Sequence, residues 1–216
     1  MNNQIKKITT IGMLCALAYV AVAVGRIPLI LFLKYDPKDV IIAIGGLIWG
    51  PLLSFIVSFI VSFVEMISIS GNGILGFIMN VISSSTFACT AAFIYKRRHT
   101  LSGAYIALFS GWFLMVAVML LWNYLIAPIY MGYSREAVVK LLLPVFLPFN
   151  LIKGGLNTAI TLLLYKSIEN ALRNANLIPN KITTSPKPKK NIGVLLVALF
   201  IFATCILLLA SLKGII

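Results

Sequence analysis

The stretch that most constrains this chain is a long apolar segment that contains a lysine. Residues 144–164 read PVFLPFNLIKGGLNTAITLLL, which is long enough for a helix to cross a bilayer, and Lys153 lies near the middle. A charge at membrane depth costs roughly 2.5–3.5 kcal/mol on insertion scales, so such a lysine usually faces a cavity or a partner. The segment therefore predicts a helix in a membrane bundle with a polar feature in its interior.

Two asparagines share a helical face with this lysine. Asn150 precedes Lys153 by three residues and Asn157 follows it by four, and both offsets return to the same side of a helix. An amide offers a donor and an acceptor, whereas lysine offers only donors. Such a face suits the edge of a heterocycle with alternating carbonyl and N–H groups. The alternative is a lysine that snorkels or pairs within the bundle.

Composition indicates a membrane protein with several spans. Of the 216 residues, 61% are hydrophobic and 11% are charged, against about 25% charged in soluble domains. The formal charge of +13 would suit a nucleic-acid partner, but the basic residues cluster at the ends of apolar segments. The positive-inside bias explains that distribution better. We therefore expect a multi-pass protein of the cell membrane with a cytoplasmic N-terminus and no nucleic-acid partner.

The cysteines and the N-terminus point to neither metal binding nor secretion. Cys15, Cys89 and Cys205 each lie inside an apolar segment without metal-ligand spacing, so no metal site is expected. The first apolar run follows a charged start, as in a signal peptide, but it is long and lacks a clear A-x-A cleavage signal. We expect an uncleaved first helix.

The apolar segments predict an all-α membrane helix bundle. They lie at residues 8–25, 40–49, 52–68, 74–95, 101–126, 144–164 and 192–212. Residues 40–49 are too short for a full span, and Gly50 and Pro51 predict a tight turn after them. The predicted division is a membrane domain at 1–172, a cytosolic Pro/Lys-rich linker at 173–191 and a C-terminal transmembrane helix at 192–216. That last helix is expected to pack peripherally.

Further polar residues lie within or beside the apolar segments. Asp36 precedes Pro37, so it is either the N-cap of the next helix or a ligand contact. Glu65 lies in an apolar run and either sits at the membrane interface or accepts hydrogen bonds from a polyol. Asn123 stands between two aromatic residues that suit an interfacial belt, which does not account for the amide itself. With the N-terminus inside, these groups gather toward the outer half of the bundle.

Small residues recur at a spacing of four along the first segment. The pairs are Gly12 with Ala16 and Ala21 with Gly25. Pairs of this kind allow another helix to approach closely. Packing within this chain and contact with a partner subunit are both open interpretations.

Short motifs follow one another in a characteristic order. They are LKYDPKDV at residues 33–40, GLIWGP at 46–51, MN at 79–80, Asn123 with APIY at 127–130, and PFNLIKG at 148–154. Their order and spacing resemble the riboflavin-specific substrate-binding (S) component of energy-coupling factor (ECF) transporters, over about residues 5–172. The resemblance implies a six-helix S-component core, to which the C-terminal helix is an addition.

The resemblance also implies a binding site for riboflavin, as transported substrate rather than cofactor, under the loop after the first helix. Asn123, Asn150 and Lys153 would approach the isoalloxazine, and Tyr35 and Asp36 would belong to the covering loop. The candidate substrate-binding residues are Tyr35, Asp36, Glu65, Met79, Asn80, Asn123, Asn150 and Lys153. The implied partners are a membrane scaffold subunit and two ATPases, docking at Gly12 and Ala16 or at Ala21 and Gly25.

The residues agree with a binding subunit that is not an enzyme. The chain has no G-x-x-x-x-G-K-[ST] phosphate loop, so energy must come from partners or ion gradients. The sole histidine, His99, lies in a basic loop beside no serine motif or carboxylate pair. We expect a high-affinity riboflavin-binding subunit driven by an ATP-dependent module. The alternative is a stand-alone secondary transporter of a vitamin or other small heterocycle, although no convincing internal repeat supports it.

Overall fold

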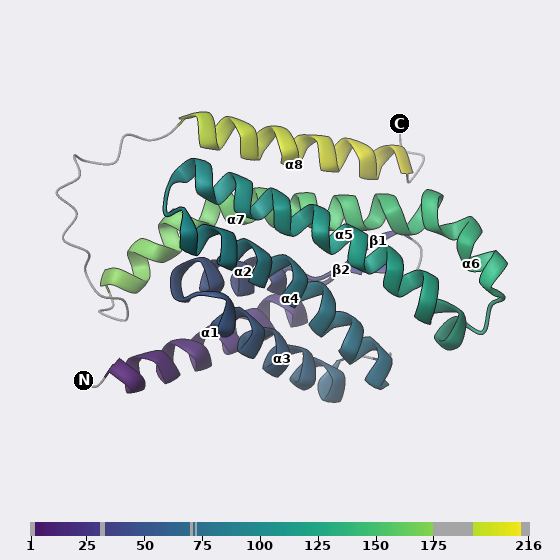
Figure 1. Ribbon diagram of the computed structural model, residues 1–216, viewed down its shortest axis with the longest axis horizontal. Coiled ribbons are helices and arrows are strands. Elements are labelled where there is room, and N and C mark those ends of the chain that lie inside the picture. Colours follow the sequence, from purple (N-terminus) through teal and green to yellow (C-terminus); the bar gives the residue numbers. More distant parts are fainter. Residues whose placement is uncertain (1–2, 31–32, 70, 72, 175–191, 213–216) are drawn as a thin grey trace.

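Long helices make up most of the described residues, with a small hairpin after the first helix (Figure 1). The computed structural model describes residues 3–30, 33–69, 71, 73–174 and 192–212. The elements are α1 (Asn3–Gly25), β1 (Ile27–Ile30), β2 (Leu33–Tyr35), α2 (Lys38–Trp49), α3 (Pro51–Ser68), α4 (Gly73–Arg97), α5 (Leu101–Met131), α6 (Arg135–Leu141), the π-helix η1 (Leu142–Phe146), α7 (Leu147–Asn174) and α8 (Ile192–Leu212).

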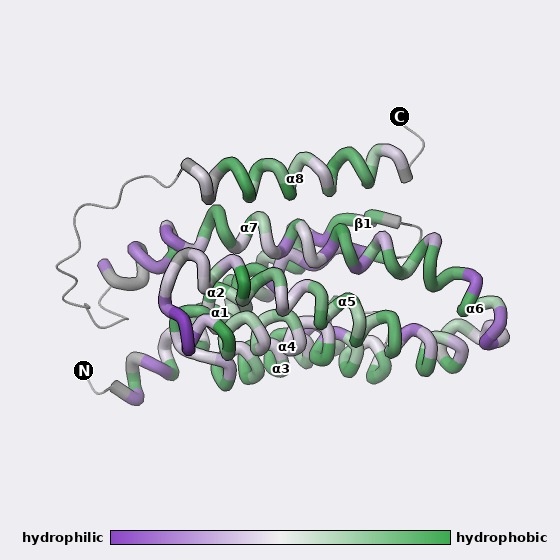
Figure 2. Tube along the Cα trace, turned by 45° about the horizontal axis from the view of Figure 1, so that its top comes forward, coloured by the Kyte–Doolittle hydropathy of each residue, from purple (hydrophilic) through white to green (hydrophobic). Residues whose placement is uncertain are grey.

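The helices have the lengths and hydropathy that a membrane bundle requires. Stretches long and apolar enough to span lie at Lys7–Gly25, Pro51–Ser68, Gly73–Arg97, Ser102–Ile129 and Arg135–Ala171. Figure 2 shows hydrophobic residues along the helices and hydrophilic residues at the N-terminus, at the α4–α5 connection and around α6. The predicted all-α membrane bundle is confirmed.

The short helix α2 lies at the centre of the bundle and packs against α1, α3, α4 and α7. A Cβ atom on Gly46 would lie 1.9 Å from the Ser54 Oγ atom and 3.1 Å from the Ala92 Cβ atom, so glycine permits this close approach. Gly50 then turns the chain with φ 99°, and Pro51 begins α3. The predicted tight turn is confirmed.

The segment between α1 and α2 is a hairpin. Strands β1 and β2 pair antiparallel, with Ile27 opposite Tyr35 and a register irregularity between Pro28 and Ile30. Asp36 does not cap α2, because Pro37 is the N-cap residue and provides no side-chain hydrogen bond. The Asp36 carboxylate instead accepts a hydrogen bond from Arg26 Nε at 2.7 Å. The capping interpretation of Asp36 was therefore wrong, since the nearby guanidinium is the stronger partner.

The C-terminal helix packs at the edge of the bundle, in agreement with the expected peripheral position, and buries part of one face. Helix α8 runs beside α7 and also touches β1 (Figure 1). Its Ile201 and Cys205 side chains are buried in one cluster with Leu29 and Tyr35 of the hairpin and Ile152 of α7. Of the predicted linker at 173–191, residues 175–191 lie outside the described residues.

Candidate functional site

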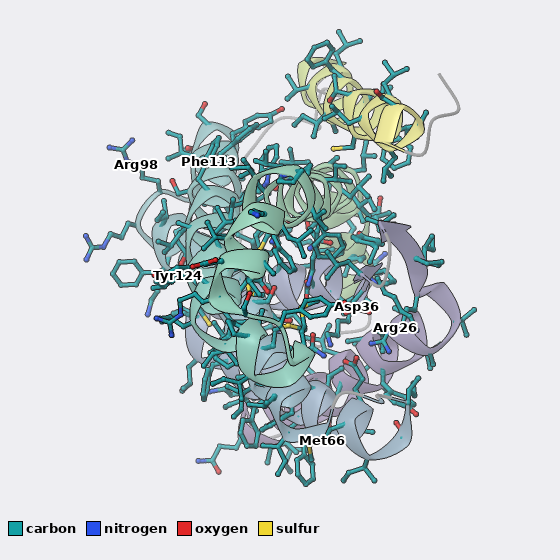
Figure 3. All side chains as sticks on the ribbon, turned by 90° about the vertical axis from the view of Figure 1, so that its right-hand side faces the viewer. Arg26, Asp36, Met66, Arg98, Phe113 and Tyr124 are labelled. Carbon is teal, nitrogen blue, oxygen red and sulfur yellow. The ribbon has the colours of Figure 1, made fainter. Side chains whose placement is uncertain are left out.

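A cavity of about 570 Å³ lies at the end of the bundle that carries the hairpin and the α3–α4 connection. This volume falls in the range of roughly 300–1,000 Å³ typical of small-molecule sites. Its lining comes from the hairpin and from α3, α4, α5 and α7. Figure 3 looks toward this end of the molecule and shows Arg26 and Asp36 close together, whereas Arg98 and Tyr124 point outward.

Most of the residues expected to bind substrate are brought together on this cavity. Its polar and sulfur-containing lining includes Asp36, Glu65, Met79, Asn80, Asn123, Asn150 and Lys153. Tyr35 does not line it. The Tyr35 ring is buried in the cluster shared with α7 and α8, and its hydroxyl has no hydrogen-bond partner among the described residues.

The polar face of α7 begins at an irregular turn. The expected helix at 144–164 is divided, because the π-helix η1 holds Pro144 and α7 begins at Leu147. Proline lacks the N–H that would continue the regular ladder, and π-helical turns are frequent at functional sites. Asn150 Nδ2 donates to the Phe146 carbonyl at 2.7 Å. That bond fixes the Asn150 amide and leaves its oxygen to accept from a ligand.

Lys153 lines the cavity and is also paired within the bundle. Its ammonium donates to Ser83 Oγ at 3.2 Å and lies 3.2 Å from Asp39 Oδ2. Asp39 also accepts from Ser84 and, at 3.3 Å, from Asn157 Nδ2. Asn157 is therefore directed to Asp39 and does not line the cavity. The pairing and ligand interpretations of Lys153 are thus compatible.

Glu65 is fully buried within the protein. Its carboxylate accepts hydrogen bonds from Arg26 and Lys38, and from Asn80 Nδ2 at 3.2 Å. The carboxylate is therefore held by partners inside the bundle, and these contacts do not depend on its depth in the membrane. Glu65 also lines the cavity together with Arg26 and Asn80.

Asp36 joins the same group of charges from the loop before α2. Burial raises the pKa of its carboxyl, but Lys38, Lys153 and Arg26 outweigh that effect and leave the pKa below its ordinary value. Asp36 is therefore an acceptor at neutral pH.

Three charged residues of this network were not among the expected site residues. They are Arg26, Lys38 and Asp39. The motif LKYDPKDV contains two of them, but the sequence alone does not show which partners they meet.

Asn123 is buried on α5 and contributes a free amide. It lines the cavity, and its amide makes no hydrogen bond to another residue in the described part of the chain. A buried amide without a partner is costly, so its presence on a cavity wall points to a ligand that supplies the missing hydrogen bonds.

The two pairs of small residues on α1 differ in environment. Gly12 and Ala16 are exposed, and a Cβ atom added to Gly12 would meet nothing within 4 Å. Ala21 is half-buried, and a Cβ atom on Gly25 would lie 2.9 Å from Pro37 Cγ. Gly12 and Ala16 therefore form the more open surface.

Comparisons with known proteins agree on one group. The sequence model of the family "ECF transporter, substrate-specific component" matches residues 6–165. The riboflavin transporter FmnP of Bacillus subtilis (strain 168) is 30% identical over 174 residues, which cover 75% of this chain and 91% of that protein. The riboflavin transporter RibU of Staphylococcus aureus (strain TCH60) is 26% identical over 179 residues, or 79% and 94% of the two chains.

A solved structure is also similar over most of its length. It is described as the S component of a bacterial ECF transporter, and it matches with a TM-score of 0.67 at 27% identity. The match covers 79% of this chain and 99% of that one. The family match at residues 6–165 ends before α8, so α8 lies beyond the part that the family model describes.

Proposed function

Because the chain belongs to the family of substrate-specific components of ECF transporters, we propose that it is the membrane subunit that binds riboflavin for uptake. The observation that carries this proposal is the cavity of about 570 Å³ on which Asn123, Asn150 and Lys153 converge from two helices. The relatives named as riboflavin transporters supply the identity of the substrate.

The α5 and α7 side of the cavity fits the edge of an isoalloxazine. The Asn150 amide oxygen can accept from a ring N–H, and the Asn123 amide can both donate and accept. Among the described residues, two of the three Lys153 N–H donors are directed to Ser83 and Asp39, which leaves the third for a ring carbonyl. Leu33, Met79, Met119 and Phe149 supply apolar walls for the ring faces.

The opposite side of the cavity fits the ribityl chain. Asp36 and Glu65 offer carboxylate oxygens, and Arg26 and Asn80 offer N–H donors. Hydroxyl groups both donate and accept, so a polyol can exchange hydrogen bonds with this set without adding charge. Glu65 thus serves as an acceptor for hydroxyls within the bundle.

Energy for uptake comes from partner subunits. Membership of the ECF family supports a membrane scaffold subunit and two ATPases as partners. The exposed Gly12 and Ala16 on α1 form the small-residue surface on which a scaffold helix docks. The basic clusters at the α1 start and the α4–α5 connection orient the N-terminus to the cytoplasm, so the cavity opens toward the outside.

A fluorescence titration tests the proposal. Flavin emission is measured as detergent-purified full-length protein is added, with thermal unfolding run in parallel to show that the protein is folded. We expect saturable quenching with one flavin per chain. Asn123→Ala should weaken it, and Asn170→Ala, on the exposed C-terminal part of α7, serves as the matched control. Folded protein that leaves micromolar flavin unquenched would refute the proposal.

A further inference from the structure

The first two residues of α2 are oppositely charged and completely buried. Lys38 is 0% exposed and Asp39 is 1% exposed. Neither side chain lines the cavity. Burial of two adjacent charges is unusual, because each must recover the solvation that it loses from partners within the protein.

Each of the two residues holds one charge of the cavity wall. Adjacent positions on a helix point in different directions, so Lys38 and Asp39 diverge. Lys38 Nζ donates to Glu65 on α3, and Asp39 Oδ2 lies 3.2 Å from Lys153 Nζ on α7. Glu65 and Lys153 both line the cavity. The start of α2 therefore connects the two sides of the site.

The position of Lys38 does not favour the helix. A positive charge in the first turn opposes the helix dipole, and Pro37 provides no side-chain cap to the free N–H groups. Apolar residues of similar size often replace a buried ion pair without loss of stability. Asp39 is an acidic residue in the first turn and suits the helix dipole, but Lys38 opposes it. Helix formation therefore does not explain the pair of charges, whereas placement of Glu65 and Lys153 accounts for both.

Asp39 is held from several sides. Its two carboxylate oxygens accept from Ser84 on α4 and from Asn157 on α7, the latter at 3.3 Å, in addition to Lys153. Because these contacts come from two other helices, α4 and α7, the Asp39 carboxylate holds the Lys153 ammonium at a fixed position. Ser83 Oγ accepts from the same ammonium at 3.2 Å, which sets its direction.

We propose that Lys38 and Asp39 are positioning residues: Asp39 holds the Lys153 ammonium and Lys38 holds the Glu65 carboxylate for contact with the ligand. This inference rests on the proposed riboflavin-binding function. Two adjacent residues behind the cavity wall would then position the Lys153 ammonium on the ring side and the Glu65 carboxylate on the ribityl side.

A double-mutant cycle on the full-length protein tests the Asp39 arm. Riboflavin dissociation constants are measured for the wild type, Asp39→Asn, Lys153→Met and the double variant. Asp39→Asn should weaken binding by about 10- to 100-fold, by analogy with residues that orient metal ligands. In the Lys153→Met background, Asp39→Asn should change the dissociation constant by less than about twofold, the usual error of additivity. A merely structural Asp39 would weaken both backgrounds equally.

Asp39→Asn leaves Lys153 buried without its counter-charge and can prevent folding. In that case the riboflavin dissociation constants of Lys153→Met and of the double variant are compared, because both proteins lack the buried ammonium. Equal constants support a role of Asp39 through Lys153, and a weaker double variant contradicts it. Asp39→Glu should restore part of the affinity by keeping the charge. The Lys38 arm is tested in the same way with Lys38→Met in wild-type and Glu65→Gln backgrounds.

Ser54→Ala is the matched control, since it removes a buried hydrogen bond from Ser54 Oγ to the Ile42 carbonyl of α2 at 3.4 Å without touching either charge. It should leave the affinity unchanged. The positioning inference would be overturned if the fold-changes in dissociation constant of Asp39→Asn and Lys153→Met simply multiply in the double variant. It would also be overturned if Lys153→Met binds riboflavin like the wild type. Neither result would contradict the proposed function. A folded wild-type chain that fails to bind riboflavin would overturn the proposed function as well.

Discussion

At the residue scale, the site depends on charges that are balanced within the protein. Among the described residues, the ion pairs form two sets. Arg26 and Lys38 pair with Asp36 and Glu65, and Lys153 pairs with Asp39. Removing one partner of a buried pair typically costs about 3–5 kcal/mol, because the remaining charge is left unpaired. An uncharged ligand can enter such a set by exchanging hydrogen bonds without disturbing the balance. Neutral amides, by contrast, can be substituted without creating a buried charge.

We expect Asn150→Ala to weaken riboflavin binding by about 1–3 kcal/mol, because a ring polar atom would lose its partner in a dry site. The Phe146 carbonyl would also lose the hydrogen bond that Asn150 Nδ2 provides at 2.7 Å. Fluorescence titration measures the change, and Asn170→Ala on the same helix is the control. Equal affinities of the two variants would show that Asn150 does not contact the ligand.

Asn157→Ala should have a smaller effect on affinity than Asn150→Ala. Asn157 lies behind the cavity wall, and Asp39 would keep its contacts with Lys153 and Ser84. We expect a loss below about 1 kcal/mol, the scale of one hydrogen bond. Titration of both variants side by side provides the measurement. A critical Asn157 together with a silent Asn150 would place the ligand deeper in the bundle.

Sequence spacing identified the site residues that share an element, but not their partners on other elements. Asn150 and Lys153 lie on one face of a helix, which periodicity alone predicts, and both line the cavity. Lys38 and Glu65 are separated by 27 positions, and Asn157 and Asp39 by 118. Contacts at such separations depend on tertiary packing, so the network formed by Arg26, Lys38 and Asp39 could not be derived from spacing.

At the element scale, two adjacent glycines of α7 allow close packing, Gly155 against α8 and α5 and Gly154 against α5. A Cβ atom on Gly155 would lie 2.7 Å from Cys205 Sγ and 3.2 Å from Trp112 Cζ2. A Cβ atom on Gly154 would lie 2.0 Å from Trp112 Cδ1. The sequence showed a helix of the right length at 192–212 but carried no signal for its docking face, because small residues and a cysteine do not specify a partner. The β1–β2 hairpin was missed for a similar reason, since its short apolar run has no turn signature.

Gly155→Ala should lower the free energy of unfolding by about 1–3 kcal/mol, because overpacking forces α8 away from α7. Cys205→Ala in the same background should recover part of that loss by removing the sulfur atom, while Trp112 remains close. Thermal unfolding in detergent compares the single and double variants, with Cys205→Ala alone as the control. If Cys205→Ala gives no recovery, the contact between α8 and α7 is not the cause of the destabilisation.

At the scale of the whole molecule, the ligand cavity and the proposed docking surface occupy different parts of the bundle. The cavity lies at the hairpin end, whereas Gly12 and Ala16 lie along the exposed side of α1. Figure 1 shows α8 on the side of the bundle away from α1, so the additional helix leaves that surface uncovered. Binding and energy coupling should therefore be separable by mutation.

The chain expressed alone should bind riboflavin without accumulating it in cells, since no nucleotide site is present in its sequence. Accumulation of radiolabelled riboflavin should appear when the scaffold subunit and ATPases are co-expressed. Ala16→Trp should then reduce uptake while sparing binding, because a bulky side chain blocks close approach of another helix on α1. Ala21→Trp is the comparison for the half-buried pair, and Leu207→Trp on the exposed side of α8, where the leucine is 59% exposed, controls for surface bulk.

If Leu207→Trp reduces uptake as strongly as Ala16→Trp, the docking surface is not confined to α1. Concentrative uptake by the lone chain that a protonophore collapses would instead identify a secondary transporter.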